Sequence, residues 1–287
     1  MSTQISTAFV NKFKADANLV VQQLLSAFRD KVTIEPMIKD KAFFEYVGKQ
    51  NMQQRVTRHS KVTYADTPHT RRMVAATEWF TADMVDKADI ARILIDPTNK
   101  YLTAMRGAAN RKIDSMIATA LSGTAYGGVD GTTSYSLGSA NKVAAGGVGM
   151  SVGKLMDALE IFNGFDIPPE WEKWCAIGPK QVTDLLSEVE VASADYNMLR
   201  PLVEGKVARF MGFNFVMSNQ LTTNGSTTRY CPAWVKPGIT LGLNYDITTE
   251  VTIMPEYHYS YQVYLAMMLG AARMEEECVV EISCIES

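Results

Sequence analysis

The sequence predicts an α+β fold, and three observations predict it. Apolar residues recur at helical spacing over a long stretch near residue 100, strands alternate with helices after residue 150, and the pattern is almost entirely β after residue 210. The chain has 287 residues, of which 47% are hydrophobic and 21% are charged, so it can bury a large core. This composition excludes collagen-like, coiled-coil and disordered proteins.

The first third of the chain predicts an amphipathic helix and then a basic hairpin. Apolar residues at helical spacing predict the helix over residues 8–28, either within the core or as an arm on a neighbouring molecule. Residues 50–80 are polar, basic and rich in strand-forming residues, which predicts a long two-stranded hairpin. An isolated hairpin is marginally stable in water, so this one needs a partner surface. The alternative is a solvated basic loop.

Charge is distributed unevenly along the chain. Residues 1–130 carry 18 Lys and Arg against 13 Asp and Glu, a balance of +5, whereas residues 131–287 carry 10 against 18, a balance of −8. Halves of opposite sign can attract each other between copies of the chain, and neither half is basic enough for a dedicated nucleic-acid-binding domain. Short apolar stretches and a polar start predict no membrane span and no secretory signal.

The clearest predicted element is a helix over residues 97–122. Asp96 would cap it, Pro97 would occupy its first position, and Gly123 would end it. A short helix is expected before it, over 81–95, and a glycine-rich boundary segment after it, over 123–149. The later part predicts a helix capped by Ser151, a helix after Gly178, and strands at 174–177, 213–217, 227–231, 239–243, 247–254, 257–268 and 278–285. We expect the last strands to return beside the long helix and close its core.

Motifs with catalytic potential have simpler explanations. Gly149-Met-Ser151-Val-Gly153 matches a nucleophile elbow and Ser151 to Lys154 matches S-x-x-K, but a glycine-rich loop precedes the serine where an elbow needs a strand. An N-cap explains Ser151. The glycines do not fit a phosphate loop, the three histidines lack zinc-ligand spacing, and the four cysteines lack CxxC spacing and indicate reduced, buried thiols. We predict no catalytic, cofactor-binding or metal residues, with a cytosolic serine hydrolase using Ser151 as the alternative.

The order of the predicted elements resembles the major capsid proteins of tailed bacteriophages, which share the Hong Kong 97-like fold. These elements are an N-terminal arm, a long basic hairpin, a long capped helix, a central α/β lobe and closing strands. Four sequence stretches are similar to those of the family: residues 83–89 with 96–101, residues 175–186, residues 210–221, and residues 269–273 with 279–282.

The resemblance implies a division into domains. The N-terminal arm would be 1–47 and the extended β-hairpin loop 48–80. The peripheral domain would join 81–145, including a spine helix at 97–122, to 245–287, and the axial domain would be 146–244. The implied residues at subunit contacts are the loop cations Arg55, Arg58, Lys61, Arg71 and Arg72, facing acidic surface on an adjacent copy, and the arm residues Phe9, Phe13, Leu24 and Phe28.

The resemblance also implies a function. The chain would be a structural virion protein that assembles as hexamers and pentamers, in the bacterial host cytoplasm, into the icosahedral head around double-stranded DNA. Many modest contacts per subunit would sum to a stable closed shell. The implied partners are a separate scaffolding protein, the portal, decoration proteins and packaged DNA bound without sequence specificity. An encapsulin-type nanocompartment shell, which has the same fold, and a virion decoration protein are the alternatives.

Overall fold

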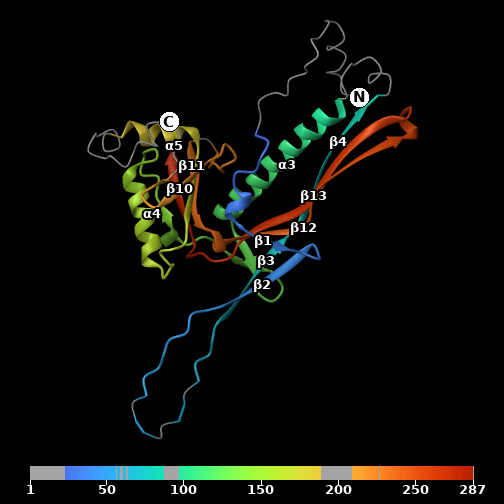
Figure 1. Ribbon diagram of the computed structural model, residues 1–287. Coiled ribbons are helices and arrows are strands. Elements are labelled where there is room, and N and C mark those ends of the chain that lie inside the picture. Colours follow the sequence, from blue (N-terminus) through green and yellow to red (C-terminus); the bar gives the residue numbers. More distant parts are fainter. Residues whose placement is uncertain are drawn as a thin grey trace.

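The computed structural model describes residues 23–55, 57–58, 61–62, 64–86, 97–188, 209–225 and 227–286. It shows two lobes and a long excursion of the chain that projects away from both (Figure 1). One buried apolar cluster runs through both lobes, from Ile113 on the long helix to Phe162 and Ile282 in the other lobe. The predicted α+β class is confirmed.

The first lobe is a long helix packed on a four-stranded sheet. Helix α3 (Pro97–Ser122) lies along the sheet, whose strand order is β1 (Thr33–Pro36), β12 (Ile239–Met254), β13 (Ser260–Arg273) and β4 (Thr77–Val85) (Figure 1). Alternate residues of β13, including Val263, Leu265 and Leu269, are buried in the cluster that also contains Ile117 of α3. The expected return of a late strand beside the long helix is therefore observed for β13.

The second lobe is built on a six-stranded sheet. Its strand order is β7 (Lys142–Val143), β14 (Val279–Ile285), β11 (Thr228–Val235), β8 (Lys173–Ile177), β10 (Phe213–Met217) and β9 (Arg209–Phe210). Helices α4 (Val152–Gly164) and α5 (Pro179–Ser187) belong to this lobe (Figure 1). Strands β8 and β10 run parallel, whereas β11 runs antiparallel to both β8 and β14.

The placement of β14 differs from the expected division at residue 245. We expected residues 245–287 to stay with the long helix, but β14 pairs with β11 in the second lobe, from Trp234 opposite Val279 to Thr228 opposite Ile285. Strand β12 begins at Ile239, before that boundary. The alternating pattern of a strand shows which residues face a core, but it does not show which sheet supplies the partner strand.

A third, small sheet carries the projecting excursion. Strand β2 (Lys41–Val47) pairs antiparallel with β3 (His69–Ala75), and β3 continues to β5 (Ala125–Gly127) and β6 (Thr133–Tyr135). We call the residues between β2 and β3, residues 48–68, the extended segment. The hairpin expected over 50–80 thus has its paired strands at 41–47 and 69–75, and the described part of 48–68 projects without strand pairing (Figure 1).

Two predicted helices differ from the structure. Residues 77–85 form strand β4, paired with β13 along its whole length, where we expected a helix to begin at 81; residues 87–96 lie outside the described residues. Residues 23–28 are not helical and lead into the 3₁₀ turn η1 (Arg29–Lys31), although the helix was expected to reach 28; residues 1–22 lie outside the described residues.

Short elements complete the fold. The 3₁₀ turns η2 (Ser139–Asn141), η3 (Lys236–Gly238) and η4 (Pro255–Tyr257) connect strands. The two strands expected at 239–243 and 247–254 are one strand, β12, whose register against β13 shifts on either side of Tyr245. These shifts bend a continuous strand, so the polar residues at 244–246 do not end it.

Candidate assembly surfaces

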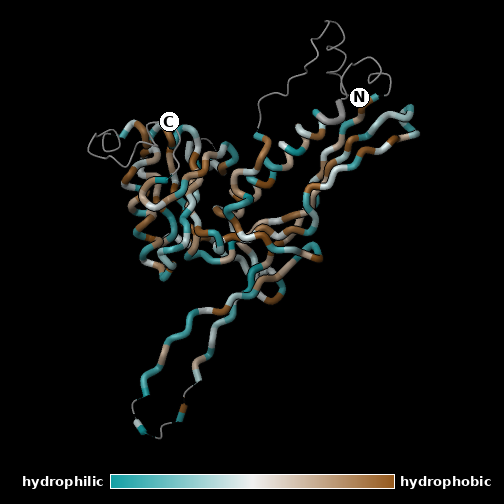
Figure 2. Tube along the Cα trace, in the orientation of Figure 1, coloured by the Kyte–Doolittle hydropathy of each residue, from teal (hydrophilic) through white to brown (hydrophobic). Residues whose placement is uncertain are grey.

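The extended segment exposes both cations and apolar side chains. Arg55, Arg58 and Lys61 are exposed, and no ion pair joins any of them to another described residue. The exposed fractions of Met52, Val62 and Tyr64 are 101%, 76% and 91%. One arm of the segment is largely hydrophilic (Figure 2). Exposed apolar side chains next to cations, on a segment that projects from the lobes, are typical of a surface that contacts another molecule.

Arg71 lies on β3 at the root of the extended segment. Its guanidinium forms an ion pair with Glu45 across the hairpin and lies 5.4 Å from the centre of the Phe43 ring. The hydrogen bond from Arg71 lowers the pKa of Glu45. Arg71 is thus partly engaged within its own hairpin, although its side chain stays 38% exposed.

Arg72, the next residue, does not belong to the exposed cluster. It is buried, and its Nη2 donates to both carboxylate oxygens of Glu276 at 2.8 Å. Its Nε donates to the Met274 carbonyl at 3.1 Å, and its guanidinium lies 3.5 Å from the centre of the Tyr135 ring. Side chains on β3 alternate between faces, which sends Arg71 outward and Arg72 inward. The structure therefore corrects the expectation that Arg72 faces an adjacent copy.

Lys49, which the sequence did not single out, fastens the other arm of the extended segment. Its Nζ lies 3.2 Å from Asp166 Oδ2 and 3.1 Å from Glu277 Oε2. The hydrogen bonds that Lys49 donates, to Glu277 first and then to Asp166, raise the pKa of Lys49. Both ion pairs are exposed and individually weak, but they join the root of the segment to the second lobe.

The expected arm residues divide between core and surface. Phe28 is fully buried and packs edge-on against Trp234, with ring centres 5.7 Å apart, so it belongs to the core of its own chain. Leu24 is 43% exposed. Phe9 and Phe13 lie outside the described residues.

A buried carboxylate on α3 explains why residues 23–28 are not helical. Asp114 is fully buried and accepts hydrogen bonds from the backbone N–H groups of Ala27 and Phe28 at 2.9–3.2 Å. It also accepts from Ser26 Oγ and Gln23 Nε2, both at 2.5 Å. Because all these donors bind one side chain of α3, the segment curves around it instead of forming a helix. The helical spacing of apolar residues in the sequence does not indicate such a tertiary contact.

Ser151 acts as a helix cap. Its Oγ accepts from the backbone N–H of Lys154 at 3.3 Å, and the N–H of Val152 donates to Glu188 of the second lobe at 2.7 Å. The ammonium of Lys154 is buried and donates to three backbone carbonyls at 2.8–2.9 Å, so it is not placed as a base for the serine. A Cβ at Gly149 would meet Asp184 Oδ2 at 2.1 Å, so close packing explains the glycine.

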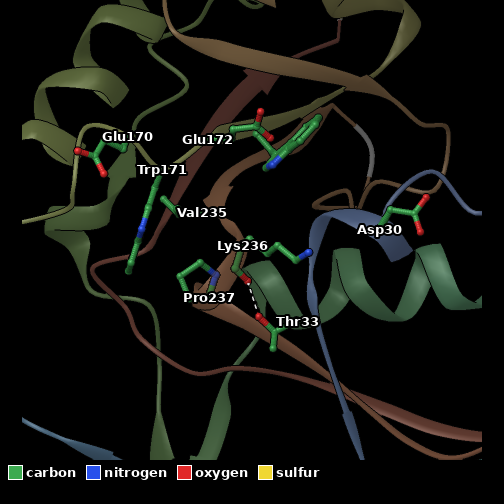
Figure 3. A pocket seen from close by; sticks show the side chains of 9 residues that line it. Asp30, Thr33, Glu170, Trp171, Glu172, Val235, Lys236 and Pro237 are labelled. Carbon is green, nitrogen blue, oxygen red and sulfur yellow. Dashed lines mark hydrogen bonds between the residues drawn. The ribbon is translucent and has the colours of Figure 1, made fainter.

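A hollow of about 470 Å³ opens where the two lobes meet. Its walls come from the turn η1, from β1, from the loop before β8 and from the end of β11 (Figure 3). Three carboxylates line it, together with one ammonium and two indoles: Asp30, Glu170, Glu172, Lys236, Trp171 and Trp174. The pattern of the sequence did not single out these residues, because they come from three separate stretches of chain.

Two further findings bear on what the chain can do. Among the described helices, none has the length and hydropathy that crossing a membrane requires. The described residues also contain no group of three or more His, Cys, Asp and Glu side chains placed to hold a metal ion.

The chain is similar to solved phage capsid structures over nearly its whole length. The capsid of cyanophage P-SCSP1u is 18% identical with a TM-score of 0.77, and the match covers 98% of this chain and 94% of that one. A structure from Mycobacterium phage Che8 is 14% identical with a TM-score of 0.72, covering 96% and 97%. The capsid of Ralstonia phage GP4 is 12% identical with a TM-score of 0.71, covering 96% and 95%. These likenesses confirm the capsid fold that the order of elements indicated.

The sequence itself matches a described family. No curated protein matches the chain. Residues 5–286 match the family described as phage capsid protein, which is almost the full length and includes both lobes and the extended segment. This chain therefore belongs to the phage capsid protein family.

Proposed function

We propose that this phage capsid protein is the major capsid protein, many copies of which form the icosahedral head around double-stranded DNA. The observation that carries the proposal is the extended segment. It exposes apolar and cationic side chains far from either lobe, where no described residue of its own chain covers them, so they are suited to contact with another molecule. Repeated contacts of this kind, each modest, stabilise a closed shell of identical subunits.

The subunit is organised for contacts in several directions. The first lobe would be the peripheral domain, and the second lobe, including β14, the axial domain around which hexamers and pentamers form. Arg55, Arg58 and Lys61 would contact acidic surface of an adjacent copy. Charge complementarity of this type fixes the register of neighbours more than it adds affinity.

We further propose the partners that the family resemblance implies. These are a separate scaffolding protein during assembly in the host cytoplasm, the portal at one vertex, decoration proteins on the outer surface, and packaged DNA on the inner surface. Contacts with DNA would be independent of sequence and sensitive to salt.

Shortening the extended segment tests the proposal. Replacing residues 48–68 by a two-residue Asn-Gly turn would join β2 to β3 directly, and β2 and β3 would keep their pairing. We expect the full chain to sediment as large assemblies, and the shortened chain to fold but remain as single subunits or isolated rings. Assemblies of equal size and yield from both chains would contradict the proposed role of the segment.

A further inference from the structure

The hollow between the lobes has the chemistry of a site for cationic side chains. Among the described residues, three carboxylates and the Lys236 ammonium line it, and the Lys31 ammonium lies over the Trp174 ring, so three negative charges face two positive ones. Glu170 and Glu172 are exposed and form no ion pair with any described residue. The remaining negative charge, together with the two unpaired carboxylates, favours a basic partner.

Aromatic faces in the same hollow add to this preference. The Lys31 ammonium lies 5.3 Å from the ring centre of Trp174, so one indole of the hollow already has a cation near its ring. Trp171 is 43% exposed, and its indole stands at the edge of the hollow beside Pro237 (Figure 3). A planar guanidinium can stack on such a ring while its N–H groups donate to neighbouring carboxylates.

The chain itself carries the complementary surface. The extended segment places Arg55, Arg58 and Lys61 within seven residues, next to the exposed Val62 and Tyr64. An extended chain spans about 3.3 Å per residue, so about ten residues in each arm carry the tip roughly 30 Å from its root. The segment points away from both lobes of its own subunit, so the surface that it reaches belongs to another molecule (Figure 1).

We propose that the hollow formed by Asp30, Glu170, Trp171, Glu172 and Trp174 binds the cationic tip of the extended segment of a second copy. This inference rests on the proposed function and adds the place of contact. Trp171 and one arginine of the neighbour would form the centre of the contact, with the carboxylates around them. Trp and Arg are the residue types that most often dominate interface energy.

Site-directed crosslinking between copies tests the proposal. Chains carrying Arg58→Cys and chains carrying Glu172→Cys are co-assembled, and the assemblies are treated with a short bismaleimide. All four native cysteines are buried, so background reaction is low. The matched control replaces Glu172→Cys by Asp157→Cys, an exposed carboxylate on α4 of the same lobe.

The expected result is a crosslinked peptide pair joining positions 58 and 172, at least tenfold more abundant than the pair joining 58 and 157. Repeating the experiment with Arg55→Cys and Lys61→Cys covers the remaining cations. Shells that form normally but give no crosslink from any of the three positions to 172 would overturn the inference and leave the proposed function intact. Failure of the unsubstituted chain to form shells would overturn both.

Charge exchange provides a second test that does not depend on crosslinking. Glu170→Arg with Glu172→Arg should lower the yield of shells at least tenfold, and so should Arg55→Glu with Arg58→Glu. Combining all four substitutions in one chain restores opposite charges across the contact, and we expect the yield to return to within about threefold of the original chain. If the two double variants and the fourfold variant are all soluble and folded, but the fourfold variant does not recover the yield of shells, direct pairing is contradicted.

Discussion

At the scale of single residues, the buried charges of this capsid protein fasten segments of chain to one another. Asp114 holds the entry to the first lobe, Lys154 closes the turn before α4, and Arg273 donates to the carbonyls of Leu121 and Gly123 at the end of α3. The C-terminal end of a helix has carbonyls without intrahelical partners and carries partial negative charge. A cation there donates hydrogen bonds to these carbonyls and balances the charge. The sequence identified none of these partners, because each pair is separated by long stretches of chain or joins a side chain to the backbone.

Asp114→Ala should destabilise the subunit by about 3 kcal/mol, because it leaves the buried N–H group of Phe28 and the partly buried N–H group of Ala27 without an acceptor. Denaturant unfolding of the isolated subunit measures the change. Asp157→Ala, on the exposed surface of α4, is the control and should change the free energy of unfolding by less than about 0.5 kcal/mol. Equal effects of the two substitutions would show that Asp114 does not anchor the segment.

Glu276→Ala should also destabilise the subunit, by about 3 kcal/mol, because it leaves the buried guanidinium of Arg72 without a counter-charge. Glu45→Ala removes the partner of the adjacent Arg71, where solvent screens the charge, and should leave the free energy of unfolding close to that of the original chain. Thermal and denaturant unfolding of both variants distinguish the two arginines. A larger effect at Glu45 would contradict the inward placement of Arg72.

The four thiols should resist modification in the folded chain. All four cysteines are free and buried, and burial raises the pKa of Cys278 to about 12, which lowers the fraction of reactive thiolate at pH 8 roughly a thousandfold. We expect a thiol reagent to label the folded protein slowly and to label four thiols rapidly in denaturant. Rapid labelling of any cysteine without denaturant would show that its part of the core opens.

At the scale of elements, the sequence predicts those whose signals are local. Helix α3 has the expected bounds of 97–122, and β10 has the expected bounds of 213–217. Strand β4 was missed because Met84 and Val85 fit a helical pattern as well as a strand, and pairing with β13 decides between them. Strand β14 was recognised as a strand, but its sheet depends on pairing with β11, more than forty residues earlier in the chain.

An ion pair between elements makes stability depend on pH. Arg29 of η1 donates to Asp246 of β12 at 2.5 and 3.0 Å, and this hydrogen bond lowers the pKa of Asp246 below its ordinary value of 3.8. A carboxylate whose pKa is lower in the folded state than in the unfolded state stabilises the fold. This stabilisation is fully present at pH values above the pKa of the unfolded state. That stabilisation is lost as the pH falls below 3.8 and through the folded pKa.

Asp246→Asn should therefore be less stable than the original chain at pH 7, and the difference should shrink as the pH falls below about 4. The free energy of unfolding, measured from pH 3 to pH 7 for both chains, tests this. A difference that stays constant over the whole range would contradict stabilisation by the ionised Asp246.

At the scale of the whole molecule, the fold is two lobes and one long segment that is joined to the second lobe at its root through Lys49 and projects away from both lobes beyond it (Figure 1). The sequence predicted that a basic hairpin with little apolar surface needs a partner, and the opposite charges of the two halves indicated another copy. The acidic, aromatic hollow could not be predicted, because Asp30 and Glu172 are separated by most of the chain and meet only in the fold.

The central claim is that copies of this chain close into a shell, and electron microscopy of the purified protein after size-exclusion chromatography tests it most directly. We expect closed icosahedral particles, or rings of five and six subunits. Each subunit in them should show two lobes, one that fits α3 with its sheet and one that fits the six-stranded sheet. A uniform population of monomers or dimers, unchanged at high concentration and after addition of scaffolding protein, would contradict the claim.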